Sequence, residues 1–152
     1  MKKVGFYFDG VVDNLKDKRA LSNFINTVVL EANRKVGPLA YTFTTDEKLL
    51  ALNKQYLKHK TLTDIITFDY SDEKALSGEI FISIERVAEN SIKFGDSYTK
   101  ELLRVIFHGL LHLLGHKDKD TEDINRMRRL ENELINRFTA FKIDVSRETL
   151  KT

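Results

Sequence analysis

Three of the four histidines lie close together, in the segment His108-Gly-Leu-Leu-His112-Leu-Leu-Gly115-His116. On an α-helix, residues four apart lie on the same face, so the imidazoles of His108 and His112 can converge on one metal ion. Two such rings on an otherwise apolar helix also need polar partners, because burying them without partners costs free energy. The pair therefore predicts two of the ligands of a metal site.

A third ligand is expected shortly after Gly115, where the glycine allows the chain to leave the helix and turn back. The pattern H-E-x-x-H-x-x-G-x-x-H uses this layout, and Asp118 occupies the position of its third histidine. His116 is the better zinc ligand by chemistry, so it is the alternative third ligand. We predict one zinc ion per chain, bound by His108, His112 and Asp118.

Three protein ligands leave one position of a tetrahedral ion for water, which is typical of a catalytic site. In H-E-x-x-H peptidases the glutamate is the general base, and Gly109 has no side chain for that role. A peptidase is therefore disfavoured. Glu79 is a candidate general base or orienting group, although a strand glutamate that faces solvent is the plainer interpretation.

The histidines are predicted to lie on a helix that begins near Tyr98 and becomes apolar on every side from Leu102, which indicates burial in the middle of the domain. Period-2 runs predict strands, and period-3.6 runs predict further amphipathic helices. The expected fold is α/β or α+β, with a small four-stranded mixed sheet and about five helices. The expected strands are Val4–Phe8, Leu39–Thr44, Thr63–Phe68 and Glu79–Ile84, and the other expected helices are Leu21–Ala32, a Thr44-capped helix to Tyr56, Ile84–Ile92 and Ile124–Phe141.

The composition suits one compact domain over residues 1–152, with 41% hydrophobic and 32% charged residues. There is no cysteine, which excludes disulfides and thiolate ligands. The start, MKKVGFYFDG, lacks the apolar run of a signal peptide. The longest apolar stretch, Leu102–Leu114, is too short to span a bilayer. We therefore expect a cytoplasmic protein without membrane contact. A formal charge of +2 neither favours nor excludes a nucleic-acid partner.

Several blocks resemble one family when read together. HGLLHLLGHKD resembles the YbeY family (also called the UPF0054 or rRNA maturation factor family) signature HGxLHLxGYDH. LNKQY at Leu52–Tyr56, TDIITF at Thr63–Phe68 and GEI at Gly78–Ile80 are similar to the family blocks LNxxYR, TDVLSF and GDI. Their order and spacing agree over most of the chain. The combination is highly specific, whereas each block alone is weak.

The resemblance implies a zinc-dependent, single-strand-specific endoribonuclease for 3′-end maturation of small-subunit rRNA and ribosome quality control. It implies ribosomal RNA and the small subunit as partners, with a ribosomal protein or a GTPase that recruits the enzyme. The alternatives are a ribosome-biogenesis binding factor with a structural metal and, less favoured, a metallopeptidase.

Three positions depart from the family pattern. Asp118 replaces the third histidine, Glu79 replaces the GDI aspartate, and Leu57 replaces an arginine that could hold a phosphate. His59, given a catalytic role here, or its neighbours Lys58 and Lys60 can substitute for that arginine. RNA contacts are expected at Lys54 and this basic segment. For Arg126, Arg128 and Arg129 a solvated helix face is the favoured interpretation.

Overall fold

The computed structural model describes residues 3–57 and 63–151 of the chain, and in them the four strands form one mixed sheet in the order β1-β2-β4-β3. β1 (Val4–Phe8) pairs in parallel with β2 (Lys35–Thr44), and β2 pairs in parallel with β4 (Ala75–Ser83). β3 (Ile65–Asp69) runs antiparallel to β4 at the edge of the sheet. The mixed four-stranded sheet predicted from the sequence is confirmed.

The described residues also contain five α-helices, which agrees with the expected α+β fold. These are α1 (Lys18–Glu31), α2 (Asp46–Leu52), α3 (Ile84–Phe94), α4 (Tyr98–Leu113) and α5 (Thr121–Lys151). A π-helical segment, η1 (Asn53–Leu57), directly follows α2. Within the described part of the chain, no helix combines the length and the apolarity that a membrane span requires.

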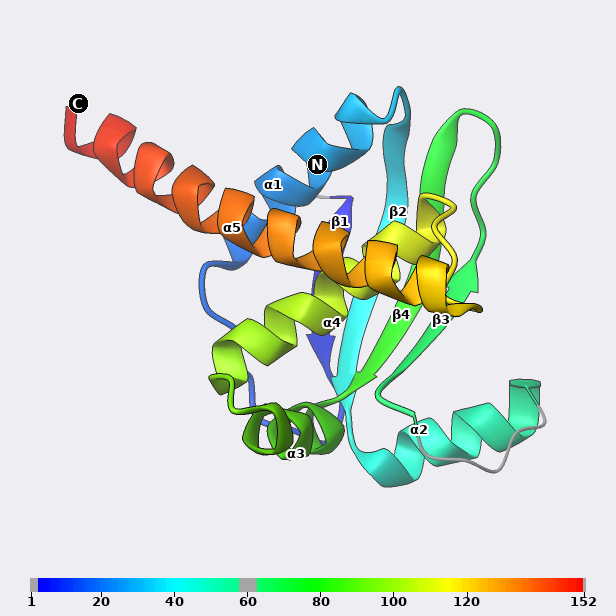
Figure 1. The fold of residues 1–152 in the computed structure, drawn as a ribbon. Coiled ribbons are helices and arrows are strands. Elements are labelled where there is room, and N and C mark those ends of the chain that lie inside the picture. The colour runs from blue at the N-terminus through cyan, green and yellow to red at the C-terminus, as the bar shows by residue number, and fades with distance from the viewer. Residues whose placement is uncertain (1–2, 58–62, 152) are drawn as a thin grey trace.

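The helices α1, α4 and α5 lie on one face of the sheet, with α5 crossing in front of α4, whereas α2 lies beyond the end of the sheet (Figure 1). Helix α4 contacts β3 and β4 on one side and α3 and α5 on the other. This position explains why almost every residue from Glu101 to Leu111 is buried. The histidine helix is therefore the buried central helix that its apolar composition predicted.

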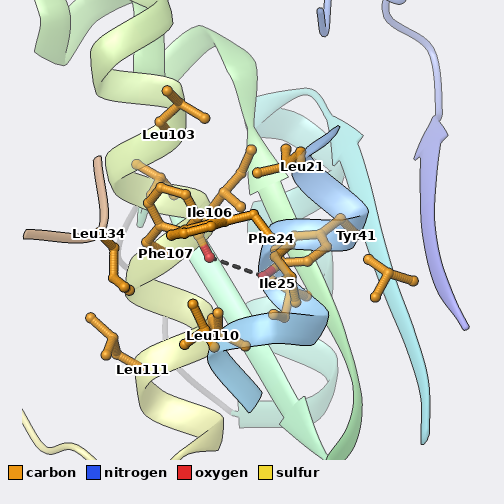
Figure 2. Close-up of a cluster of buried hydrophobic side chains, with 14 of the residues drawn as sticks. Leu21, Phe24, Ile25, Tyr41, Leu103, Ile106, Phe107, Leu110, Leu111 and Leu134 are labelled. Carbon is orange, nitrogen blue, oxygen red and sulfur yellow. Dashed lines mark hydrogen bonds between the residues drawn. The ribbon is translucent and has the colours of Figure 1, made fainter. Parts of the chain in front are cut away.

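The main core lies between α1, α4 and the sheet (Figure 2), and Phe24, Ile25 and Ile106 in it are at most 2% exposed. The hydroxyl of Tyr41, in β2, donates a hydrogen bond to the carbonyl of Ile106 at 3.0 Å. Burying these side chains contributes about 1.5–3 kcal/mol each. The packing therefore fixes α4, and with it the histidines, against the sheet.

Most element boundaries differ from the sequence prediction by a few residues: β4 begins at Ala75 rather than Glu79, and α5 continues to Lys151. Two further differences have a clear physical reason. Gly37-Pro38 was expected to precede the second strand, but β2 begins at Lys35 and passes through it with a register shift between Val36 and Leu39. A bulge leaves one residue unpaired, so a proline without an N–H is tolerated there. The cap of α2 is Thr45, whose side chain accepts a hydrogen bond from Lys48 N–H, and Thr44 is the last residue of β2. The capping prediction was thus one residue early.

Gly109 allows α4 to approach the sheet closely. A Cβ atom at this position would lie 3.0 Å from the Cδ1 atoms of both Ile65 and Ile80. Such a contact is tighter than ordinary van der Waals packing, so a larger residue would push the helix away from the strands. The absence of a glutamate at this position, noted from the sequence, therefore has a packing reason in this fold.

Candidate metal centre

The end of α4 directs the chain back toward its own histidines. Gly115 has φ +99°, a left-handed conformation that favours glycine. The N–H of Gly115 donates to the carbonyl of His112, and the N–H of His116 donates to that of Leu111. This pair of bonds is the Schellman pattern of a helix C-terminus. The reversed chain then brings Asp118 next to the last turn of the helix.

Three ligand atoms meet at this point. The Nε2 atoms of His108 and His112 are 3.1 Å apart, and each lies 3.4 Å from Oδ2 of Asp118. A tetrahedral ion with bonds of about 2.0–2.1 Å needs neighbouring ligand atoms roughly 3.3 Å apart. The three atoms therefore have the spacing of one face of a zinc tetrahedron. Among the described residues, His108, His112 and Asp118 form a group that could hold a metal ion.

His108 is oriented by a residue from another helix. Its Nδ1 lies 2.6 Å from Oε2 of Glu131, a buried residue of α5. Because the carboxylate accepts a hydrogen bond, Nδ1 carries the proton and Nε2 presents its lone pair toward His112 and Asp118. Burial disfavours the imidazolium, but the hydrogen bond and charge of Glu131, with the charges of Asp64 and Asp118, outweigh burial and raise the pKa of His108.

Glu131 belongs to a buried group of charges behind the histidines. Arg104 Nη1 lies 3.4 Å from Oε1 of Glu131, and its Nε lies 3.6 Å from Oε1 of Glu101. Asp96 completes the group, with Oδ2 at 3.9 Å from Arg104 Nη2. Burial raises the pKa of Glu101, although the charge of Arg104 opposes that change. Because buried charges need partners, the group holds Glu131, and hence the His108 ring, in a defined place.

The three ligand residues open into a pocket of about 700 Å³ between β3, α4 and α5. Their side chains are 21% (His108), 31% (His112) and 41% (Asp118) exposed, so the cluster is accessible from the pocket. Asp64, just before β3, lines the same pocket and interacts with the charge of His108. Burial raises the pKa of Asp64, an effect that the charge of His108 only partly offsets. From the sequence, Asp64 is expected only to cap a turn or to pair with a lysine, within the TDIITF block.

The other predicted site residues have different positions. Glu79 is exposed in β4, opposite Phe68 of β3 and Ala40 of β2. It alternates with Ile80, which faces α4, so it points to the other face of the sheet and does not line the pocket of the histidines. Its catalytic role stays a prediction without a contact to support it. His59 lies outside the described residues, as do Lys58 and Lys60.

The fold places His116 away from the histidine pair and distributes the arginines of α5 over different surfaces. His116 lines a smaller pocket with Lys117 and Arg126, and it does not join His108 and His112. Arg128 lines the large pocket, whereas Arg129 is exposed and lines none of the described pockets. The structure thus brings Asp118, rather than His116, to the histidine pair.

Comparison with known proteins identifies extensive similarity. The profile of the family described as "YbeY: Endoribonuclease YbeY" matches residues 11–139. A Flavobacterium johnsoniae protein named "Endoribonuclease YbeY" is 42% identical over 125 residues, which cover 82% of this chain and 90% of that protein. A Bacteroides fragilis protein of the same name is 44% identical over 118 residues, covering 78% and 85%. The solution structure of TM1509 from Thermotoga maritima aligns with a TM-score of 0.60 and 25% identity, covering 90% of this chain and 92% of that one.

Proposed function

The chain belongs to the YbeY family, described as endoribonucleases, and from this premise we propose that it is a zinc-dependent endoribonuclease that cleaves single-stranded RNA. The observation that carries the proposal is the triangle of ligand atoms from His108, His112 and Asp118, with sides of 3.1, 3.4 and 3.4 Å. This spacing suits a small ion that takes nitrogen and oxygen ligands in tetrahedral geometry. The family names thus support cleavage of RNA, and the ligand geometry supports a metal ion in the site.

The accessibility of the cluster favours a catalytic ion over a structural one. A structural zinc site is closed by four protein ligands, whereas here three ligands face a pocket and are one fifth to two fifths exposed. When bound, the ion would acidify a water and polarise a phosphoryl oxygen. A binding factor with a purely structural metal does not need an open pocket at the ion.

The residues around the cluster have separable roles in this proposal. Glu131 holds the proton on Nδ1 of His108 and keeps the ring oriented. Asp64 is the carboxylate outside the ligand set that we assign to the attacking water, because it lines the same pocket and because burial raises its pKa, which makes it a stronger base than an exposed aspartate. Gly109 supplies no side chain, so the proposal does not use the glutamate base of the H-E-x-x-H peptidases.

The ion has a second role in this proposal, which is to balance the negative charge of the pocket. The lining contains four carboxylates, of Asp64, Glu101, Asp118 and Glu131, and two guanidinium groups, of Arg104 and Arg128. With neutral histidines this leaves two formal negative charges in excess, which one divalent ion would balance. Without the ion, the pocket would repel a phosphate. RNA binding and cleavage are therefore both expected to require the metal.

Within RNA, we propose the 3′ end of small-subunit ribosomal RNA as the substrate, with the small ribosomal subunit as the binding partner and a ribosomal protein or GTPase that recruits the enzyme. This assignment is supported by the family blocks in the sequence, from TDIITF to HGLLHLLGHKD. Such a role would put the protein in the cytoplasm, as the cysteine-free composition predicted.

A circular single-stranded RNA provides a direct test, because it has no ends and only an endonuclease can open it. We expect the metal-loaded protein to linearise the circle, and the chelated protein and the His112→Ala variant to lose this activity. Re-addition of zinc should restore cleavage by the native protein only. Linearisation at an equal rate after complete metal removal would contradict the proposal.

A further inference from the structure

The pocket is lined by more residues than the metal ligands, and part of its lining is aromatic and cationic. Phe94, at the end of α3, lines it and is 53% exposed. Ile124 of α5 lines the same pocket and is 51% exposed. Exposed apolar side chains that gather in one concave site commonly mark a ligand surface. Binding of a metal ion does not account for the exposed side chains of Phe94 and Ile124 in this pocket.

The ring of Phe94 is flanked by two cations. The guanidinium carbon of Arg128 lies 5.9 Å from the ring centroid, and Nζ of Lys93 lies 5.6 Å from it. Guanidinium groups and aromatic rings both stack on nucleobases, and the cation also attracts phosphate. The combination of an exposed ring with adjacent positive charge is the chemistry by which proteins bind single-stranded nucleic acid.

Arg128 is connected to the metal ligands through one side chain, that of Glu131. Arg128 Nη1 lies 3.9 Å from Oε1 of Glu131, and Oε2 of Glu131 lies 2.6 Å from Nδ1 of His108. A single carboxylate therefore separates the guanidinium beside Phe94 from the first ligand of the metal. The nucleotide next to the cleaved phosphate could therefore place its base near Phe94 and Arg128.

We propose that Phe94 and Arg128 form a stacking subsite for one unpaired base of the RNA substrate, with Arg128 also contacting a neighbouring phosphate. The inference rests on the proposed nuclease function and deepens it, because it explains how a single strand is selected. A base in a duplex is already paired and stacked, so it cannot reach the ring, whereas an unpaired base can. Stacking of this kind tolerates any base, which predicts little sequence preference at this position.

The first arm of the test is fluorescence, because the chain contains no tryptophan. The Phe94→Trp variant carries a single indole in the pocket, and the Ile92→Trp variant carries one on the same helix, at a site that is 83% exposed and does not line the pocket. A short oligoadenylate is added to each metal-loaded variant. We expect quenching of the Phe94→Trp signal and little change in the Ile92→Trp signal. An abasic oligomer of the same length should quench neither.

The second arm is affinity for the same oligomer. Loss of one stacked base weakens binding on the order of 10-fold, so Phe94→Ala should show that loss and Ile92→Ala should not. Arg128→Gln should lower the salt dependence of binding by about one phosphate contact, while Arg129→Gln, on the exposed side of α5, should leave it unchanged. All four positions are exposed, so these variants are expected to fold.

The outcomes separate the subsite from the nuclease. Selective quenching of the Phe94→Trp variant, with weaker binding by Phe94→Ala, supports the subsite even if the native protein cuts no RNA, in which case the nuclease proposal fails. Equal quenching of both tryptophan variants, quenching by the abasic oligomer, or native affinity of Phe94→Ala would overturn the subsite. Cleavage of the circular RNA by the native protein would in that case leave the nuclease proposal intact.

Discussion

At His108, the two ring nitrogens have different neighbours, and that difference determines what the residue can do. Nδ1 lies 2.6 Å from Glu131, and Nε2 lies 3.1 Å from Nε2 of His112 and 3.4 Å from Asp118. A hydrogen-bonded carboxylate on the rear nitrogen fixes the tautomer and makes the front nitrogen a better ligand. Glu131 is therefore a positioning residue whose effect should appear in metal affinity before it appears in catalysis.

The Glu131→Gln variant tests this role. A neutral amide accepts a weaker hydrogen bond than a carboxylate, so we expect zinc affinity to fall by about 10- to 100-fold. Competition with a zinc-chelating dye measures the affinity, and Glu133→Gln, an exposed position on the same helix, is the matched control. Native zinc affinity in a correctly folded Glu131→Gln variant would remove Glu131 from the site.

Asp64 predicts a pH dependence of stability in the metal-free protein. Burial raises its folded-state pKa, so the folded state binds the proton more tightly than the unfolded state does. The stabilising effect of protonation is present below the unfolded pKa of about 4 and is lost as the pH rises through the folded pKa. We expect Asp64→Asn to be more stable than the native protein at neutral pH, with the difference vanishing in acid, as measured by urea unfolding.

Asp72 provides a control of opposite sign. Hydrogen bonds from the backbone N–H groups of Ala75 and Lys74 lower its pKa. Its contribution to stability is present above the unfolded pKa and is lost as the pH falls through the folded pKa, so Asp72→Asn should be less stable than native at neutral pH. A loss of stability at neutral pH in Asp64→Asn, in the direction expected for Asp72→Asn, would contradict the burial argument for Asp64.

Among the helices, the end of α4 can be compared with the end of α3, because a glycine follows each of them. Gly115 and Gly95 both follow a helix with positive φ, +99° and +71°, and a Cβ atom would meet nothing within 4 Å at either position. Alanine in a left-handed conformation costs about 1–2 kcal/mol, so both alanine variants should lose similar stability. Only Gly115 controls the turn that carries Asp118.

We therefore expect Gly115→Ala to weaken zinc binding well beyond its loss of stability, and Gly95→Ala to bind zinc with native affinity. Urea unfolding of the metal-free proteins and chelator competition measure the two quantities. Equal zinc affinity in both variants would mean that the Gly115 turn does not position the third ligand.

The grouping of His108, His112 and Asp118 could be predicted from the sequence because it depends on local geometry. His108 and His112 are one helical turn apart, and the glycine turn that returns Asp118 is encoded within the next six residues. Glu131 comes from α5, 23 residues after His108, and Asp64 comes from the start of β3. Their approach to the histidines depends on the packing of helices on the sheet, for which no local pattern exists.

In the rest of the fold, too, features set by local sequence could be predicted, whereas features set by tertiary packing could not. The five helices and the mixed sheet followed from periodicity, and the buried central helix followed from its apolar composition. The continuation of β2 through Gly37-Pro38 did not, because tertiary pairing with β4 outweighs the local preference of that dipeptide. The general-base prediction for Glu79 depended on a sequence block alone, and strand alternation turns that side chain toward the other face.

At the scale of the whole molecule, the pocket combines the features of the site. It lies between β3, α4 and α5, so the candidate metal ligands, Asp64 and the proposed Phe94–Arg128 subsite line one pocket. Its four carboxyl groups outnumber its two guanidinium groups, so we expect a bound divalent ion to favour phosphate in the pocket. Metal binding and RNA binding should therefore be coupled in this protein.

The most direct test of this account is a titration of zinc into the metal-free protein while cleavage of a labelled single-stranded RNA is followed. We expect the cleavage rate to rise in proportion to zinc and to reach a plateau at one ion per chain. We also expect Asp118→Ala to need a large excess of zinc, whereas His116→Ala should behave like the native protein. Cleavage before any zinc is added, or an unchanged titration of Asp118→Ala, would contradict the proposal that His108, His112 and Asp118 hold a catalytic ion.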